Sequence, residues 1–136
     1  MSSLGAVKAE KISIIGVRII SAAIDHPSDG LFLDIKGFKT DVAFTTGFNL
    51  EDKLARAELE IKVETDSEQA EKGRCRYNIH FIYKIDNLDE LVSMTADGLD
   101  VSQSLQNTLA SVSYSTARGM LINRLQNTVF QDFILP

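Results

Sequence analysis

Cysteine, basic clusters and long hydrophobic runs are all scarce in this sequence. The one cysteine, Cys75, excludes an intramolecular disulfide and fits a reducing compartment. A net charge of -5 and the lack of any Lys/Arg run argue against nucleic acid as a partner, because phosphate binding needs a basic surface. The most apolar stretch, residues 12–24, contains Arg18 and is too short to span a bilayer. The first residues also lack an apolar signal region, so we expect a cytoplasmic protein without membrane insertion.

Groups that carry enzyme chemistry are equally sparse. The two histidines, His26 and His80, could form a usual zinc site with one cysteine only if several carboxylates joined them. Cys75 alternates with apolar residues, which predicts a buried, inert thiol rather than a nucleophile. The acidic stretch IDNLDEL lacks the glycine and the spacing of a calcium loop. Neither a glycine-rich phosphate loop nor a nucleophile elbow is found, so we predict a non-enzyme without metal or cofactor.

The apolar residues that are present suffice for one packed core. A length of 136 residues with 44% hydrophobic residues predicts a single domain covering residues 1–136. Residues 54–65 and 74–85 alternate strictly between apolar and polar, which is typical of half-buried strands. The short polar connection between them predicts an antiparallel hairpin, with acids and bases paired across its outer face. Another strand is expected around residues 40–48.

The stretch from residue 12 to residue 24 follows a different pattern, because it is apolar on both faces. One face carries Ile12, Ile14, Ile20, Ala22 and Ile24, and the other carries Ile15, Val17 and Ile19. A small antiparallel sheet normally leaves one face to water, so both faces of this strand must be covered. The cover comes either from the chain's own loops over a central strand or from a second subunit.

A helix is predicted over residues 103–127, with Asp100 and Ser102 as suitable N-caps. It carries an apolar stripe of Leu105, Leu109, Val112, Ala117, Leu121 and Leu125. Its serine-rich stretch, Ser111–Ser115, contains poor helix formers and predicts a kink or frayed turn. Strands followed by a helix predict an α+β fold, a four-stranded antiparallel sheet with a long C-terminal helix packed on one face.

The C-terminal stretch YSTARGMLINRLQNTVFQDFILP resembles the end of the SecB family of export chaperones. There a helix of the type FPYAR…I..L… leads to FP.L.L.P, and the matching residues are Tyr114, Ala117, Arg118, Ile122, Leu125, Phe130, Ile134 and Pro136. IYKIDNLDEL resembles the family's IFRIEGIPEEEL at the end of the fourth strand. SAAIDHP resembles D.SFEAP, with Asp25 and Pro27 aligned. The resemblance spans roughly residues 12–136 and implies the SecB fold.

The resemblance also implies a function. SecB-like proteins are tetramers, dimers of dimers, that hold unfolded chains in long apolar grooves between sheet and helix without ATP. The residues expected to line such a client groove are Phe32, Phe38, Phe44, Phe48, Phe130, Phe133 and Ile134, although aromatic residues fill cores by default. The residues expected at subunit interfaces are Ile15, Val17, Ile19, Leu109, Val112 and Leu121.

The positions equivalent to the family's docking site for the translocase motor SecA have a different charge here. Ser21 stands where the family has an acid, and Arg74 and Arg76 replace an exposed leucine and glutamate; Asp25 is aligned. These cations would repel the basic SecA tail, because like charges oppose docking. We therefore expect weak or undetectable SecA binding, and a chaperone that guards an antitoxin becomes an alternative.

Two other functions stay open. One is an interaction module or chaperone that is dedicated to a single partner. The other is a small-ligand carrier that uses the same groove. Suppression of aggregation of several unrelated unfolded proteins would separate a general chaperone from a single-partner module. A lipid or metabolite found by mass spectrometry of the purified protein would favour the carrier.

Overall fold

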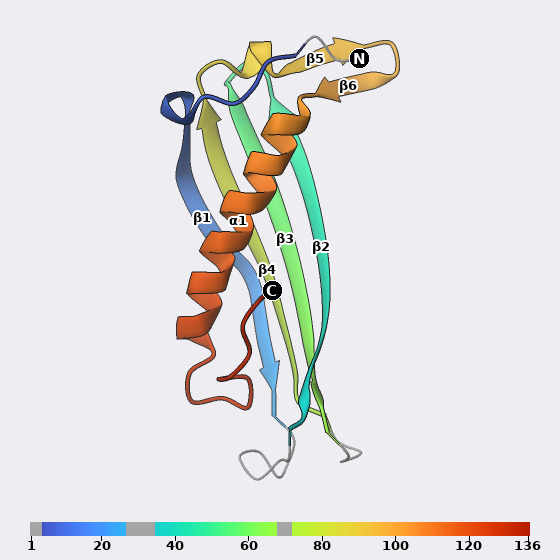
Figure 1. Ribbon diagram of the computed structural model, residues 1–136, viewed down its shortest axis with the longest axis vertical. Helices are drawn as coiled ribbons and strands as arrows, with labels where there is room; N and C mark the ends of the chain where they lie inside the picture. Colours follow the sequence, from blue (N-terminus) through green and yellow to red (C-terminus); the bar gives the residue numbers. More distant parts are fainter. Residues whose placement is uncertain (1–3, 27–34, 68–71) are drawn as a thin grey trace. The chain divides into compact units, whose positions relative to one another are not determined.

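The computed structural model describes residues 4–26, 35–67 and 72–136. These residues form a four-stranded sheet, a separate two-stranded sheet and one long helix (Figure 1). The elements are the 3-10 turn η1 (Ala9–Lys11), the strands β1 (Ile12–Asp25), β2 (Gly37–Asn49), β3 (Leu54–Asp66) and β4 (Arg74–Ile85), the 3-10 turn η3 (Leu88–Glu90), the strands β5 (Val92–Thr95) and β6 (Gly98–Val101), and the helix α1 (Gln103–Arg124). The antiparallel sheet has the order β1-β4-β3-β2, and β5 pairs with β6 separately. The predicted α+β class is confirmed.

The chain divides into two compact units, each with its own share of the four long strands and of α1. The hairpin unit consists of the first 18 residues, Phe44–Glu58 and His80–Ser113, and it includes β5 and β6. The tail unit consists of Ile19–Ala43, Leu59–Ile79 and Tyr114–Pro136. The prediction of one domain over residues 1–136 stays a prediction.

β3 and β4 form the predicted hairpin, and its register is the same at both ends. In the tail unit, the Thr65 amide donates to the Gly73 carbonyl at 2.9 Å. In the hairpin unit, the Ile85 amide donates to the Lys53 carbonyl, also at 2.9 Å. Every second residue of both strands is buried, as the alternation predicts. These buried side chains are the contribution of the two strands to the core: Ala55, Ala57, Leu59, Ile61, Val63, Cys75, Tyr77, Ile79, Phe81, Tyr83 and Ile85.

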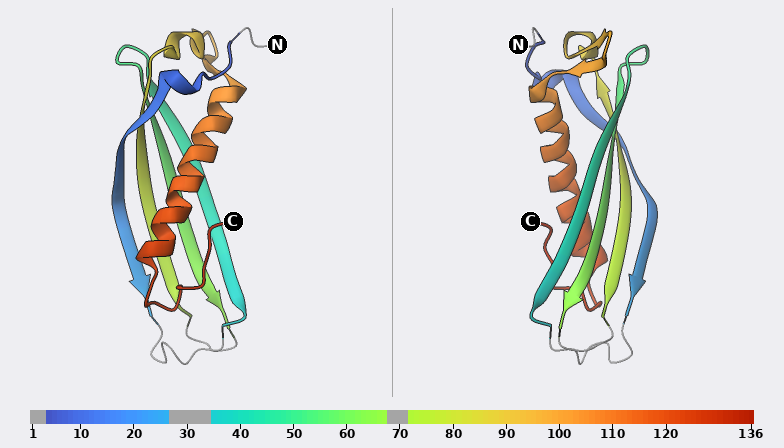
Figure 2. Two further views of the ribbon diagram at one scale, coloured as in Figure 1. Left: turned by 60° about the vertical axis from the view of Figure 1, so that its left-hand side comes forward. Right: turned by 90° about the vertical axis from the view of Figure 1, so that its right-hand side faces the viewer.

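The helix covers this buried face within each unit (Figure 2). Leu105 and Leu109 are fully buried in the hairpin unit, and Leu121 is buried in the tail unit. The Tyr83 hydroxyl lies 2.7 Å from the Ser113 hydroxyl, and both side chains are buried. The predicted kink or frayed turn at residues 111–115 is wrong, because α1 is continuous there. The bond to Tyr83 gives the Ser113 hydroxyl a tertiary partner, so it need not compete for the helix backbone.

The start of the helix is fixed by the N-terminal segment rather than by a capping side chain. Ser102, the residue before α1, is buried, and its hydroxyl donates to the Gly5 carbonyl at 2.7 Å. Two residues later, the Ser104 hydroxyl accepts a hydrogen bond from the Val7 amide at 3.0 Å. Ser102 rather than Asp100 therefore occupies the N-cap position, but its side chain bonds the N-terminal segment instead of the first turn of the helix.

The C-terminal segment after α1 folds back into the core of the tail unit (Figures 1 and 2). Arg118 donates from Nε to the Leu135 carbonyl at 2.7 Å, which ties the last residues to the helix. The Phe38 ring of β2 lies 6.0 Å from that of Phe130 and 5.4 Å, edge to face, from that of Phe133. A Cβ at Gly73 would lie 3.0 Å from the Val129 side chain, so a larger residue there would require Val129 to shift.

β1 is an edge strand, and one of the two explanations for its apolar character is therefore wrong. It lies outside β4 in the sheet order, so it is not a central strand covered by loops. Ile15 and Ile20 remain 58% and 54% exposed, and Val17 remains 38% exposed. Such a strand presents both apolar side chains and unpaired backbone groups to its surroundings.

Candidate functional site

The first candidate surface is a row of phenylalanines on the edge strand β2. Phe44 and Phe48, in the hairpin unit, are half-buried, and so is Phe38 in the tail unit. Their even spacing puts Phe44 and Phe48 on the same face of β2 within the hairpin unit. In the tail unit, the Phe38 ring contacts the buried tail. Half-burial leaves part of each ring available for another apolar chain. Phe32, the fourth candidate, lies outside the described residues.

The tail residues named as groove candidates differ strongly in exposure. Phe130 and Phe133 are buried, at 0% and 4% exposure, whereas Ile134 is 62% exposed. Phe130 and Phe133 therefore pack inside the tail unit, where their rings contact the Phe38 ring. Only Ile134 presents its side chain for direct contact with a bound chain.

The interface candidates also separate into two groups. Ile15 and Val17 are exposed and Ile19 is half-buried, so the strand candidates are available to a partner. On the helix, Leu109 and Leu121 are buried inside their own units, while Val112 is half-buried. A partner that covers β1 would therefore meet strand residues rather than the leucines of the helix stripe.

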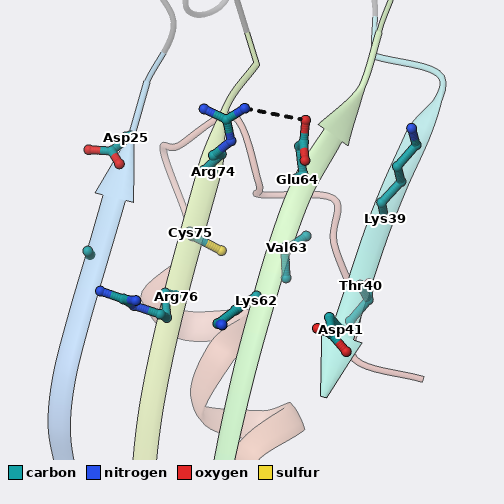
Figure 3. Close-up of a pocket in the computed structure, with 11 residues that line it drawn as sticks. Asp25, Lys39, Thr40, Asp41, Lys62, Val63, Glu64, Arg74, Cys75 and Arg76 are labelled. Atoms are coloured by element: carbon teal, nitrogen blue, oxygen red, sulfur yellow. Dashed lines mark ion pairs between the residues drawn. The ribbon is translucent and has the colours of Figure 1, made fainter. Parts of the chain in front are cut away.

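A second candidate surface is a cavity of about 570 Å³ in the tail unit, on the outer face of the sheet (Figure 3). Three of the four positions equivalent to the SecA-docking site, Asp25, Arg74 and Arg76, line this one cavity. Ser21, the fourth, is exposed on β1 but does not line it. The remaining lining residues are Ala23, Lys39, Thr40, Asp41, Lys62, Val63, Glu64 and Cys75.

The titratable groups of β4 that point inward are suited to packing rather than to chemistry. Burial raises the pKa of the Cys75 thiol to about 11, so it stays protonated and unreactive at neutral pH. Burial likewise raises the pKa of Tyr83, although its bond to Ser113 acts in the opposite direction. Among the described residues, no three His, Cys, Asp or Glu side chains gather into a metal-binding group.

One exposed element was not predicted from the sequence. The β5–β6 hairpin places Met94 opposite Leu99, and these side chains are 73% and 45% exposed. The Asp97–Gly98 dipeptide between two short apolar stretches is a hairpin signal, and Gly98 has the positive φ, 119°, that favours glycine.

In the described ranges, no helix combines the length and the apolar character that crossing a membrane requires.

Comparison with known proteins adds one result. No protein-family model matches the sequence, and no curated protein matches it. Among solved structures, the chain is similar to the Mycobacterium tuberculosis Rv1957 SecB-like chaperone, in complex with a ChAD peptide from the Rv1956 HigA1 antitoxin. The two share 6% identity with a TM-score of 0.57, over 86% of this chain and 83% of that chain. Identity this low speaks to the fold alone, and the predicted SecB-like fold is confirmed.

Proposed function

We propose that this protein is an ATP-independent chaperone that holds unfolded polypeptide segments along β2. The observation that carries the proposal is the row of two half-buried phenylalanines, Phe44 and Phe48, on the edge strand β2 within the hairpin unit of a SecB-like fold. An edge strand offers free backbone donors and acceptors to an extended segment. The ring faces add apolar contact that does not depend on one client sequence.

The energy of such binding comes from many small contributions. Apolar area removed from water contributes about 25 cal/mol per Å², so a segment that covers several rings gains affinity without a specific pocket. Ile134 of the tail extends the same kind of surface in the tail unit. Phe130 and Phe133 hold Phe38 in place from the core side. Binding and release of this kind need no nucleotide.

The nature of the client separates a general chaperone from a dedicated one. The M. tuberculosis neighbour was solved with a peptide from an antitoxin, which supports a toxin–antitoxin partner as one version of the proposal. Export through SecA is the less favoured version, because Arg74 and Arg76 put cations where a basic SecA tail would dock. The setting that we propose is the cytoplasm.

We further propose that the working form is a homo-oligomer, a tetramer in the version closest to SecB. The exposed apolar side chains on one face of β1, Ile15 and Val17, supply the surface for a second copy. Isolated apolar residues on a surface are ordinary, but several on one edge strand are typical of an interface.

The experiment that tests the chaperone proposal measures aggregation of two unrelated unfolded proteins by light scattering. We expect the wild-type chain to suppress both, and Phe44→Asp and Phe48→Asp to abolish most of the effect. The matched control is Thr45→Asp, an exposed neighbour on the opposite face of β2, which should keep full activity.

Three other outcomes would redirect the proposal. Suppression confined to one client would make the protein a single-partner module. A lipid or metabolite that co-purifies and is lost in Phe44→Asp would indicate a small-ligand carrier. Equal loss in Thr45→Asp would mean that the charge disrupts the strand, and the row of phenylalanines would no longer carry the proposal.

A further inference from the structure

On the outer face of the β3–β4 hairpin, acidic side chains face basic ones across the two strands, but at one position two basic side chains face each other. The register fixed by Thr65–Gly73 and Ile85–Lys53 sets Glu64 opposite Arg74, and their side chains form an ion pair at 3.8 Å. The same register sets Glu58 opposite His80, where the side chains lie 3.4 Å apart.

The exception is Lys62, which this register places directly opposite Arg76 in the tail unit. Because the odd-numbered pairs exchange the backbone hydrogen bonds, Lys62 and Arg76 form a non-hydrogen-bonded pair. Side chains in such pairs are the closest across an antiparallel ladder, with Cβ atoms about 4.5–5.5 Å apart. Like charges at this position destabilise a sheet.

The two cations are only partly compensated within the protein. Lys62 Nζ lies 3.5 Å from Glu60 Oε1, on the same strand and face, but both side chains are well exposed to solvent. In the described part of the chain, no carboxylate lies within ion-pair distance of Arg76. The Arg76 side chain extends toward β1, away from Lys62 (Figure 3). The space between them is therefore positive and open.

This positive pair lies in the outer-face cavity, which crosses all four strands. Ala23 of β1 leaves room beside Arg76, and Thr40 lines the cavity from β2. Carboxylates occupy both sides, with Asp25 on β1 and Asp41 on β2. A ligand that fills the cavity must be elongated, carry a negative group at its centre and tolerate acids at its ends.

We propose that this cavity is a docking site for an extended peptide segment with a single central carboxylate, which binds between Lys62 and Arg76. Arg76 presents a planar guanidinium that matches a carboxylate, while Lys62 contributes a point charge. The flanking Asp25 and Asp41, together with the net charge of -5, disfavour a phosphate polymer or a free, multiply charged phosphate. This site is separate from the phenylalanine row and does not depend on the proposed holding function.

The test is a nitrogen-15 NMR titration of the full chain with a synthetic peptide that carries one central Glu flanked by Ser on both sides. We expect saturable shifts at residues 62–64 and 74–76, which weaken on going from low salt to about 0.15 M. Lys62→Gln and Arg76→Gln should each raise the Kd by about two- to fivefold, the range of a solvent-exposed ion pair. The matched control is Arg56→Gln, an exposed cation of β3 that does not line the cavity, and it should leave the Kd unchanged.

Several results would overturn the proposal. A Lys/Ser peptide that binds equally well, or an equal effect of Arg56→Gln, would show that the cavity does not select acids. Inorganic phosphate that binds as tightly at the same residues would make it a small-anion site rather than a peptide site. Because aggregation suppression should be intact in Arg76→Gln, loss of peptide binding and loss of holding activity are distinguishable.

Discussion

β1 and β4 are neighbours in the sheet, both are rich in isoleucine, and yet their environments are opposite. In β4 every second residue from Cys75 to Ile85 is apolar and buried. In β1 the apolar residues fall on both faces, and the strand remains mostly exposed at the edge of the sheet. The difference shows that apolar content alone does not indicate burial. Alternation indicates burial by the chain itself, whereas the strand that lacks it stays exposed at the edge of the sheet.

The largest expected effect compares core and edge directly. Phe81→Ala removes a fully buried ring of β4 and should lower the free energy of unfolding by about 3–5 kcal/mol. Ile15→Ala, at a side chain that is 58% exposed, should cost far less in the monomer. Urea unfolding at low protein concentration measures both, and equal losses would contradict the contrast between the strands.

The next effect tests the proposed second copy. Ile15→Lys and Val17→Lys place a charge on the exposed part of β1 and should convert the proposed oligomer to monomer, with a loss of at least about 2 kcal/mol of association energy. Sedimentation measures the state, and circular dichroism checks that the monomer stays folded. The control is Ser13→Lys, an exposed polar position of the same strand. A wild-type chain that sediments as a monomer at micromolar concentration would remove the interface.

A smaller effect is expected where β4 meets the helix. Tyr83→Phe leaves the Ser113 hydroxyl buried without its 2.7 Å partner, and it should cost about 1–2 kcal/mol. The double variant with Ser113→Ala should cost less than the two single losses added together, because both remove the same hydrogen bond. Thermal unfolding of the three variants provides the measurement, and strictly additive losses would argue against the bond.

The smallest effect lies on the outer face. Lys62→Gln removes the like-charge repulsion across the ladder from Arg76. Although it also breaks the exposed pair with Glu60, it should stabilise the protein by a few tenths of a kcal/mol at low salt. The gain should fade as salt rises, since the charges are exposed. Glu64→Gln, which breaks the pair with Arg74, should act in the opposite direction. Denaturant titrations at two salt concentrations compare them.

Most of the fold could be predicted from the sequence because β3 and β4 alternate so regularly. Their period of two specifies strand, face and hairpin together. The outer-face cavity could not be predicted, because placing Lys62 beside Arg76 needs the register, and a shift of two residues would pair different charges. The tail could be predicted only in part: its apolar character indicates that it is covered, but burial of Phe133 and exposure of Ile134 depend on how it turns after Asn127, which has a positive φ of 64°.

The edge position of β1 also has a consequence for the order in which the sheet forms. β3 and β4 are close in sequence and can pair early, whereas β1 joins β4 only after the chain between them has closed a long loop. The Asp86 amide, bonded to the Lys11 carbonyl at 2.9 Å, should accordingly lose its protection from hydrogen exchange sooner than the Thr65 amide. Each such opening would uncover the backbone edge of β4, a template for unwanted strand pairing. A second copy held against β1 would make these openings rarer, so the proposed assembly would also protect the protein itself against aggregation.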